Sequence, residues 1–598
     1  MTPRRRRQLV FAAALLVTLY GGLLRCEAVV ANYGWMGQPG WSMAFERHVV
    51  PIVKKLHPAS IVWGPIPNPY VGGDPINYLR FAREMRSFYQ AHVREPVFLA
   101  LTRGFLWVTG GRDIAVSYAS AFAGTAAILA TFLLGVVMGS RVAGLAAALA
   151  LATEYQAIAW SMDGWRDDTF MLFVTLSAAT LIVVHRQPRR FSAVLAGVAA
   201  AAACLTRISS LSFIVPALVW MVAMPGPVPR QIAARHVGIV ALVCAVLTGP
   251  YLFNCWRATG DPLYALNYHA RYYRSAEGLK TDESVGALQY ASAKLTSRPI
   301  ATLDTASQGL VTVPFFNKWN GWAPWASWIG PLLRTLAALG VLLAVWLPQG
   351  RLLLVIMITS LVPYALTWSV GGGGEWRFTQ HVYPAYLVLA FLALVAIVDG
   401  VRYVARNRQV ALMLSRQHRR QTIAMAAVVL IGLTGFVAAP FLVMWESLAA
   451  GDAVSVTAGD RDRLFFAGRW SEPMTAGAVT VRVAQAELVS LRLPMPEASY
   501  QLTLRLDPPL TADPSNQPTL TVFLNRKPLA RLEMARDPAR VGTYRIQVPK
   551  DSVSPVSRLD LLATHTVRAG DAGPPFERLP PDSPAAFRLW YVRLEKMP

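Results

Sequence analysis

Long apolar stretches separated by short polar segments dominate the first three quarters of the chain. About eleven of these stretches are long enough to cross the roughly 30 Å hydrocarbon core of a bilayer as helices. The pattern therefore predicts a polytopic α-helical membrane domain over residues 1–449. The expected spans are residues 9–24, 115–138, 142–159, 168–185, 191–206, 209–224, 237–255, 325–346, 352–370, 379–398 and 422–446.

The pattern changes after about residue 450, where short segments alternate apolar and polar residues. Pro, Gly, Asp and Asn separate these segments, and Leu524–Leu529 is typical of a hairpin turn. We expect a C-terminal all-β sandwich or jelly-roll domain over residues 450–598. The expected strands are Thr480–Val483, Leu488–Leu493, Tyr500–Leu506, Leu520–Leu524, Tyr544–Val548, Leu559–Leu562 and Phe587–Leu594.

The positive charge of the chain follows the boundaries of the apolar stretches. The sequence has 57 Lys and Arg residues against 34 Asp and Glu residues, a net charge of +23 at pH 7. Most Arg clusters lie between apolar stretches, so the positive-inside rule explains them better than nucleic-acid binding. Arg4–Arg7 place the N-terminus in the cytoplasm, and the count of spans then places residues 32–114, residues 256–324 and the β domain outside. Compact loops and the absence of a eukaryotic targeting signal favour a bacterial inner membrane, with the β domain in the periplasm.

The first apolar stretch has two interpretations. It is long, and Arg25 and Glu27 follow it, which favours an uncleaved membrane anchor. The alternative is a signal peptide cleaved near Val29–Ala31.

Several kinds of chemistry have no support in the sequence. It contains neither a P-loop nor the Cys/His spacing of a zinc site. No cofactor is expected, because the carboxylates are few and scattered, although Asp74 with Asp168 leaves a divalent metal ion open. Inert thiols are expected for the four cysteines, which lie in or beside apolar stretches and form no CxxC pair: Cys26, Cys204, Cys244 and Cys255.

Ionisable residues gather at the span ends that this topology places outside. Such residues are costly in a membrane and indicate a functional site. A carboxylate can accept a proton from a hydroxyl nucleophile, and arginines can hold a departing phosphate bidentately. These residues predict transfer of a sugar from a lipid phosphate to a hydroxyl or an amine. They are Asp74, Asp163, Asp167, Asp168, Arg207, Arg271, Arg274, Glu375, Arg377 and His381.

Four short motifs follow one another in a characteristic order. Asp74 is followed by Tyr78 and Ala82, and Arg94-Glu95-Pro96 then opens an apolar segment. Asp168, with Asp167 as the alternative, begins the fourth span. Arg377 later precedes His381-Val382-Tyr383-Pro384. Over roughly residues 8–400, this order resembles the C-type (GT-C) membrane glycosyltransferases, which include the protein O-mannosyltransferases and the lipid A aminoarabinose transferases.

The chain departs from the family pattern at two positions. Pro75 stands where many members have a second acidic residue, and Glu95-Pro96 stands where they have two prolines. The resemblance implies a polyprenyl-phosphate sugar donor, an inverting displacement, and a lipid, glycan or protein acceptor outside the cytoplasm.

The resemblance also implies roles for individual residues. Asp74 is expected to be the catalytic base, and Asp168 or Asp167 to orient the acceptor or support the site. The residues expected to hold the donor phosphate are Arg94, Arg377, Arg271 and Arg274. The residues expected to contact the rest of the substrates are Tyr78, His381, Tyr383 and Glu375.

Structural interpretations of the same residues stay open. Asp74 before Pro75 is typical of a helix N-cap, and Asp167 and Asp168 also suit a helix start. Arg207, like Arg274, is also consistent with a side chain that extends to lipid headgroups.

Two other functions remain alternatives at this point. One is a transporter or flippase for lipid-linked glycans, and the other is a glycan sensor in which the β domain is the functional part. Transporters often have repeated halves with polar groups near the midplane. Here the polar groups lie at one face and no repeat is evident, which favours the transferase.

Overall fold

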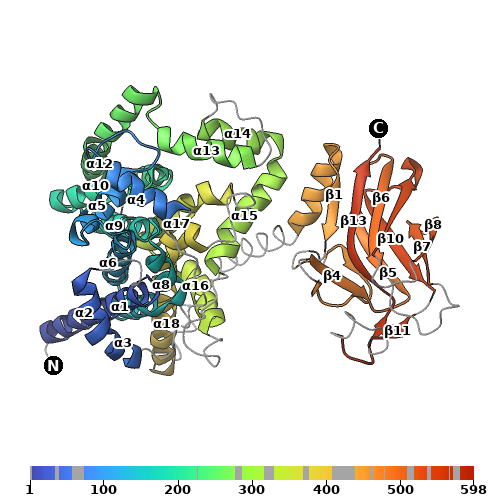
Figure 1. Ribbon diagram of the computed structural model, residues 1–598, viewed down its shortest axis with the longest axis horizontal. Coiled ribbons are helices and arrows are strands. Elements are labelled where there is room, and N and C mark those ends of the chain that lie inside the picture. Colours follow the sequence, from blue (N-terminus) through green and yellow to red (C-terminus); the bar gives the residue numbers. More distant parts are fainter. Residues whose placement is uncertain are drawn as a thin grey trace. The chain divides into compact units, whose positions relative to one another are not determined.

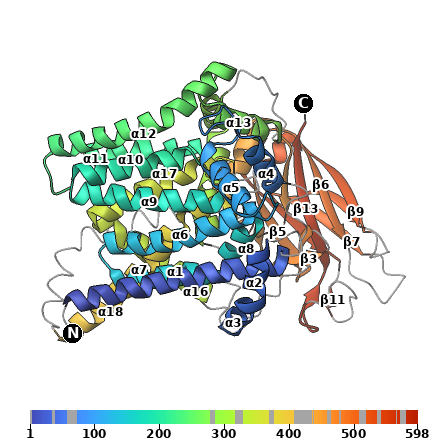
Figure 2. The ribbon, with the colours of Figure 1, turned by 60° about the vertical axis from the view of Figure 1, so that its left-hand side comes forward.

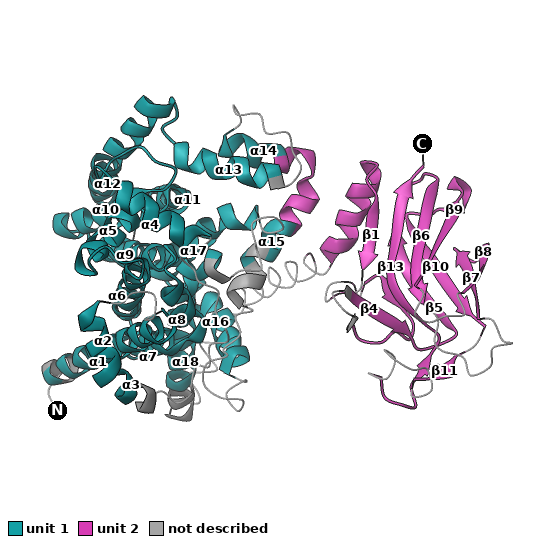
Figure 3. Cartoon of the chain, viewed as in Figure 1, with its two compact units in different colours: residues 1–293, 305–415 teal, residues 294–304, 416–598 magenta. Residues whose placement is uncertain are grey.

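The computed structural model (Figure 1) forms two compact units (Figure 3), residues 1–293 with 305–415 and residues 294–304 with 416–598. The first unit is helical, and the second consists mainly of antiparallel strands. The structure describes residues 3–33, 39–56, 73–224, 226–276, 286–315, 329–367, 376–406, 435, 438–457, 459, 462, 464–476, 479–507, 518–534, 541–564, 566–569 and 579–597.

The long helices of the first unit follow the apolar stretches of the sequence. Among them, α1 packs on α6 and α6 on α9, and α10 lies between α9 and α12 (Figure 2). The α-helices up to the middle of the chain are α1 (Pro3–Tyr33), α2 (Gly40–His48), α3 (Val50–Leu56), α4 (Asp74–Glu84), α5 (Pro96–Val108), α6 (Ala115–Val137), α7 (Arg141–Thr153), α8 (Tyr155–Asp163), α9 (Asp167–Arg186), α10 (Arg190–Cys204), α11 (Leu211–Ala223) and α12 (Arg230–Thr259). The later ones are α13 (Tyr264–Ala276), α14 (Ala287–Ser297), α15 (Pro299–Phe315), α16 (Ile329–Trp346), α17 (Pro348–Ala365) and α18 (Tyr383–Arg406), and the short 3₁₀ helices are η2 (Ile208–Ser210) and η4 (Trp376–Val382).

Seven of the described helices are long and apolar enough to cross a membrane, or eight spans if one bent pair counts as a single span. The expected polytopic helical membrane domain is thus confirmed. The seven helices are Gln8–Tyr33, Ala115–Val137, Asp167–Arg186, Arg230–Thr259, Ile329–Trp346, Pro348–Ala365 and Phe378–Gly400.

Two predicted spans are shorter in the structure. Residues 191–206 and 209–224 correspond to the shorter apolar helices Arg190–Cys204 and Ile208–Ala223. Most of the predicted span 422–446 lies outside the described residues.

The predicted span 142–159 is broken rather than continuous. α7 ends at Thr153, α8 begins at Tyr155, and the two helices are bent by 56°. Glu154 between them is extended, and its carboxylate accepts a hydrogen bond from the backbone N–H of Ala157 at 2.6 Å. Glu154 therefore starts a new helix as its N-cap, which explains the bend.

Two glycines and one buried arginine contribute to the helix packing of this unit. A Cβ atom on Gly135 in α6 would lie 2.2 Å from the Cα atom of Gly144 in α7, so both helices approach closely only because these residues are glycines. Arg25 of α1 is fully buried and donates hydrogen bonds to the carbonyl oxygens of Leu151 and Ala152, each at 3.3 Å. These contacts join α1 to the end of α7.

The second unit is a two-sheet β sandwich, as predicted. One sheet has the order β3-β4-β13-β6-β9 with β1 also on β13, and the other has the order β2-β5-β10-β7-β8. Leu504 of the first sheet and Val522 of the second belong to one buried cluster. The strands are β1 (Val454–Thr457), β2 (Phe466–Ala467), β3 (Met474–Ala476), β4 (Val479–Ala484), β5 (Leu488–Pro494), β6 (Tyr500–Asp507), β7 (Thr519–Leu524), β8 (Lys527–Glu533), β9 (Gly542–Val548), β10 (Val556–Ala563) and β13 (Phe587–Lys596), with the short pair β11 (Val567–Arg568) and β12 (Pro584–Ala585).

The seven predicted strands correspond to β4, β5, β6, β7, β9, β10 and β13. The predicted hairpin turn joins β7 to β8, where Asn525 and Arg526 have φ values of 50° and 69°. Positive φ at both central residues is the geometry of a type I′ turn, which matches the twist of a hairpin.

The second unit also includes a helical part. The carboxylate of Glu446 accepts hydrogen bonds from the backbone N–H groups of Ile300 at 3.1 Å and Ala301 at 2.8 Å. These N–H groups lie in the first turn of α15, which a carboxylate stabilises. The compact unit thus extends beyond the predicted boundary at residue 450.

Candidate active site

The first unit holds a cavity of about 840 Å³ where several helix ends meet. Its wall comprises the start of α4, the loop before α5, the residue before α9, η2, α13 and the end of α17. Its charged or titratable lining residues are Asp74, Arg94, Glu95, Arg166, Arg207, His269 and Arg271, and its aromatic lining residues include Trp165, Tyr268, Tyr272, Tyr273, Tyr364 and Phe378.

Hydrogen bonds to neighbouring helices fix the loop that carries Arg94. The Tyr251 hydroxyl of α12 donates to the carbonyl oxygen of His92 at 2.9 Å. The Val97 N–H donates to the carbonyl oxygen of Leu205, beside the end of α10, at 3.0 Å. The backbone N–H of Arg94 donates to Nδ1 of His92 at 3.1 Å. The loop is therefore anchored on both sides of Arg94, and its guanidinium has a defined place in the cavity wall.

Asp74 and Arg94 form an ion pair at the cavity, with 2.8 Å between Oδ1 and Nη2. Gly73, with φ of +78°, occupies the cap position of α4, so Asp74 is its first residue rather than its N-cap. The Asp74 side chain is 31% exposed and that of Arg94 15% exposed. Both groups therefore remain accessible to a molecule in the cavity.

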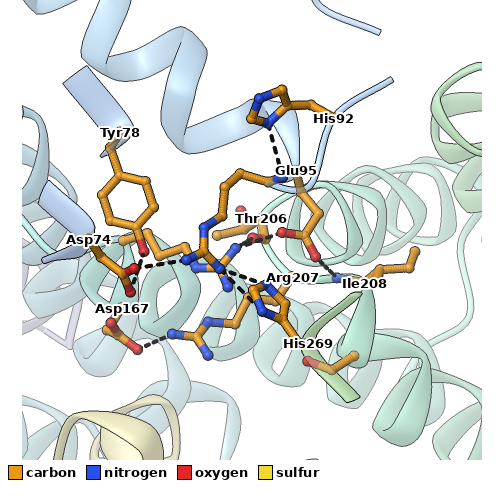
Figure 4. A network of polar contacts seen from close by, with 12 residues as sticks. Asp74, Tyr78, His92, Glu95, Asp167, Thr206, Arg207, Ile208 and His269 are labelled. Atoms are coloured by element: carbon orange, nitrogen blue, oxygen red, sulfur yellow. Dashed lines mark hydrogen bonds and ion pairs between the residues drawn. The ribbon is translucent and has the colours of Figure 1, made fainter. Parts of the chain in front are cut away.

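Tyr78 supports this pair from α4. Its hydroxyl donates a hydrogen bond to Oδ2 of Asp74 at 3.4 Å (Figure 4), and its ring packs edge-on against Phe98. Burial raises the pKa of Tyr78 to about 12, so the hydroxyl keeps its proton at neutral pH. Tyr78 thus acts on Asp74 as a neutral donor.

His269 of α13 completes the contacts of Arg94. Its Nε2 lies 2.6 Å from Nη1 of Arg94. Burial, followed by the charges of Arg166, Arg94 and Arg207, lowers the pKa of His269 well below its usual value. The imidazole is therefore neutral and accepts a hydrogen bond from the guanidinium.

A second ion pair joins Arg166, just before α9, to Glu95 in the loop before α5. The distance from Nη1 of Arg166 to Oε2 of Glu95 is 2.6 Å, and both side chains are buried. The other carboxylate oxygen of Glu95 accepts a hydrogen bond from the backbone N–H of Ile208 at 2.8 Å (Figure 4). Glu95 therefore connects three segments of the cavity wall.

A third ion pair joins Arg207 to Asp167 (Figure 4). The Arg207 guanidinium also donates to the Tyr364 hydroxyl at 3.3 Å and lies 5.4 Å from the ring centre of Phe170. Arg207 lines the cavity, whereas the predicted acid Asp167 lies behind it. The three pairs give the cavity a wall of arginines whose charge is balanced by carboxylates.

Asp168 does not line this cavity. Its side chain is fully buried and accepts hydrogen bonds from Ser120 Oγ at 2.9 Å and Gln380 Nε2 at 2.6 Å. Among the predicted acids, only Asp74 belongs to the described cavity lining.

The other predicted residues are distributed as follows. Arg271 lines the cavity, and Arg274 is buried on the same helix without being part of the lining. His381 is buried, with Nε2 at 3.2 Å from Ser360 Oγ, and Tyr383 is also buried. Glu375 and the side chain of Arg377 lie outside the described residues.

Within the described part of the chain, no group of three or more His, Cys, Asp and Glu side chains is placed to hold a metal ion. The three carboxylates nearest the cavity, Asp74, Glu95 and Asp167, each face an arginine instead.

Sequence reasoning gave no role in the site to Glu95, Arg166 or His269. The adjacency of Glu95 to Arg94 and of Arg166 to Asp167 is the only local signal. His269 carries none, because its contact with Arg94 spans 175 positions.

Residues 93–253 match the family model of dolichyl-phosphate-mannose-protein mannosyltransferases. The predicted resemblance to GT-C membrane glycosyltransferases is thereby confirmed. The matched region begins one residue before Arg94 and includes Asp167 and Arg207, whereas Asp74 precedes it. No curated protein matches the chain significantly.

Among solved structures, the chain aligns with the archaeal oligosaccharyltransferase AglB from Archaeoglobus fulgidus, in complex with an inhibitory peptide and a dolichol-phosphate. The identity is 14%, the alignment covers 74% of this chain and 57% of that chain, and the TM-score is 0.42. It also aligns with the S. cerevisiae protein O-mannosyltransferase Pmt1-Pmt2 complex bound to the sugar donor, at 14% identity, covering 46% of this chain and 37% of that chain, with a TM-score of 0.29. The chain therefore spans less than two thirds of the length of these proteins.

Proposed function

We propose that this protein is an integral membrane glycosyltransferase that moves a sugar from a polyprenyl-phosphate donor to an acceptor outside the cytoplasm, with inversion at the anomeric carbon. The observation that carries the proposal is the Asp74–Arg94 pair, an accessible carboxylate and an accessible guanidinium in contact at a large arginine-lined cavity. The membrane helices and the family match are consistent with it.

In the proposed reaction, the donor phosphate takes the place of Asp74 as the partner of Arg94. A guanidinium binds a phosphate bidentately, as it binds a carboxylate, so the exchange preserves its hydrogen bonding. Arg271 is the second cation of the lining that we assign to the phosphate.

Asp74 then acts as the base. It accepts the proton of the acceptor hydroxyl or amine while the acceptor atom forms a bond to the anomeric carbon of the sugar. The bond from that carbon to the phosphate oxygen breaks, and its electron pair leaves with the lipid phosphate. Attack opposite to the leaving phosphate inverts the configuration, and no covalent enzyme intermediate is involved.

Neutral His269 and buried Tyr78 are positioning residues in this proposal. His269 accepts a hydrogen bond from Arg94 without adding positive charge, and Tyr78 orients Asp74. Glu95 and Asp167 hold Arg166 and Arg207 in the cavity wall, where the two guanidiniums are further hydrogen-bond donors for an anionic donor.

The proposal places the cavity and the β domain on the periplasmic side of a bacterial inner membrane. The basic clusters between the spans support this topology.

The test is mass spectrometry of polyprenyl-phosphate sugars in cells that express wild type or Asp74→Asn at equal levels. Loss of a general base slows a reaction by typically about 10²–10⁴-fold, so one lipid-linked sugar should accumulate in the variant. The mass of that sugar would identify the donor.

Asp113→Asn is the matched control. Like Asp74, Asp113 lies between the first two spans and pairs with an arginine: its Oδ1 is 2.5 Å from Nη2 of Arg83. Both of these side chains are 46% exposed, however, and neither lines the cavity. Equal lipid pools in Asp74→Asn and wild type, in cells where wild type demonstrably functions, would contradict the role of Asp74 as the base.

A further inference from the structure

A second cavity, of about 710 Å³, lies where α9 and α11 end and α17 begins. The same three helices reach the first cavity with their opposite ends, near Arg166, Ser209 and Tyr364. α9 has 20 residues, and at about 1.5 Å per residue its two ends are roughly 30 Å apart. The second cavity is therefore a separate site, about one hydrocarbon-core thickness from the first.

The second cavity is lined by cations without a carboxylate. His185, Arg186 and Arg351 belong to its lining, and the described lining residues include no Asp or Glu. In the first cavity, by contrast, Arg94 and its two neighbouring arginines each face a carboxylate. Positive charge that the protein itself does not neutralise attracts an anion.

The cationic side chains have donors left for a ligand. His185 is 4% exposed, and its ring has no hydrogen-bond partner within the described residues. The Arg351 guanidinium likewise has no hydrogen bond or ion pair among them. Arg186 uses Nη1 to donate to the carbonyl oxygen of Val137 at 2.6 Å. The His185 ring, which lines the cavity, can therefore form a hydrogen bond with a bound group.

The start of α17 adds backbone donors to the same place. Leu347 occupies the cap position and offers no side-chain hydrogen bond, and Pro348 is the first helical residue. Pro348 and the next residue, Gln349, both line the cavity. N–H groups of an uncapped first turn, together with the positive end of the helix dipole, bind phosphate well.

Apart from Gln187, the remaining wall of the cavity is apolar. Trp220, Met224 and Pro227 contribute to it. Beside them, the chain passes close to the end of α9 at Gly226. A Cβ atom at this position would lie 2.5 Å from the carbonyl oxygen of His185, so the close approach requires a glycine. Trp at such a position is typical of the membrane–water interface, where acyl chains meet headgroups.

We propose that this second cavity binds the phosphate headgroup of an anionic membrane lipid. Arg186, Arg351 and the first turn of α17 hold the phosphate oxygens, the His185 ring forms a hydrogen bond with the polar headgroup, and Trp220 and Met224 contact the glycerol and acyl part. Basic pockets at the ends of membrane helices are known to favour such headgroups. The inference does not depend on the reaction proposed for the first cavity.

Cations at the end of α9 also stabilise its helix dipole. That effect explains His185 and Arg186 but not Arg351, which lies in the first turn of α17, where the dipole disfavours a cation. An anion between the two helices satisfies all three side chains.

The test is native mass spectrometry of the full-length protein, released from detergent micelles that contain phosphatidylglycerol or phosphatidylcholine. Wild type should retain phosphatidylglycerol preferentially. Arg186→Gln/Arg351→Gln should weaken its retention about tenfold or more, since each charge-assisted hydrogen bond contributes substantially to binding.

Arg190→Gln is the matched control, since Arg190 is exposed, lies four residues after Arg186 and is not part of the lining. It should bind phosphatidylglycerol as wild type does. Equal retention of the two lipids by wild type, or equal retention by the double variant and the control, would overturn the proposal.

A competition experiment distinguishes whether the cavity binds a lipid or free phosphate. Millimolar inorganic phosphate should not displace phosphatidylglycerol, because it lacks the apolar part that contacts Trp220 and Met224. Displacement by inorganic phosphate would overturn the assignment to a lipid. All variants should elute from gel filtration as wild type does, since the substituted arginines are exposed.

Discussion

Arg94 contacts two side chains of different character, a carboxylate that balances its charge and an imidazole that cannot. Burial, together with the arginines around it, lowers the pKa of His269 and keeps it neutral, which determines how the site responds to acid. In the unfolded chain a histidine titrates near about 6.5, whereas the folded protein disfavours the imidazolium. Below that pH the unfolded state therefore binds more protons, and stability falls as the pH decreases.

We expect His269→Gln, which keeps a hydrogen-bond acceptor, to reduce this loss of stability on acidification. At low pH the histidine lowers the free energy of unfolding by about 1.4 kcal/mol for each unit by which its pKa in the folded state lies below its pKa in the unfolded state. The measurement is the thermal unfolding midpoint of the detergent-solubilised protein at pH 7.5 and at pH 5.5. The midpoint should fall between these two pH values by less in the variant than in wild type. His48→Gln, at an exposed position in α2, should leave the difference unchanged. If both variants respond as wild type does, His269 is not the buried neutral group inferred above.

At the scale of elements, Glu95 is the contact that joins the loop before α5 to the starts of α9 and η2. It pairs with buried Arg166 and accepts from the backbone of Ile208. Removing one partner of a buried ion pair leaves the other charge uncompensated, typically at about 3–5 kcal/mol.

We therefore expect Glu95→Gln to lower the free energy of unfolding by about 3 kcal/mol, because the amide keeps the contact with Ile208 but cannot balance Arg166. Glu84→Gln, on the exposed end of α4, should change stability by less than about 0.5 kcal/mol. The comparison uses urea titration of both variants in the same detergent. A Glu95→Gln protein as stable as the control would mean that the pair contributes little.

The helices and strands were predictable because they depend on local patterns. The seven predicted strands lie within the observed ones, since alternation of buried and exposed residues is a property of each segment alone. The break at Glu154 was not predicted, because the surrounding residues remain apolar and only the carboxylate cap interrupts the helix.

The site was predictable only in part. Asp74 and Arg94 stand in a recognisable motif, and the structure brings them together. The partners of the other arginines lie far away in the sequence: 71 positions separate Glu95 from Arg166, and 40 separate Asp167 from Arg207. Contacts over such distances depend on how helices pack, which no local pattern encodes. For the same reason, Asp168 has the right residue type for the cavity but lies outside its wall.

At the scale of the whole molecule, the β sandwich has a core of its own. Its buried cluster is formed by residues 444–594, with Leu448, Leu504 and Val522 among its fully buried members. No residue of the seven described helices that could span a membrane belongs to that cluster.

We expect a fragment of residues 438–598 to fold without the membrane domain and to unfold cooperatively on heating. Leu504→Ala should destabilise it by about 2–5 kcal/mol, whereas Thr503→Ala, on the opposite side of the same strand, should have a much smaller effect. Circular dichroism of the purified fragment measures both. A fragment without a β-rich spectrum and a cooperative transition would show that the domain depends on the rest of the chain.

The burial of Arg25 has a consequence for biogenesis. Arg25 follows the apolar stretch 9–24 but lies within the helix Gln8–Tyr33, and a lone arginine in such a helix is unfavourable until it finds polar partners. Arg25 donates one hydrogen bond within α1, to the carbonyl oxygen of Gly21, but its other acceptors belong to Leu151, Ala152 and Ser161, which are synthesised more than a hundred residues later. We therefore expect α1 to reach its final position only after α7 and α8 have been synthesised, so that it is completed later than helices that follow it in the chain.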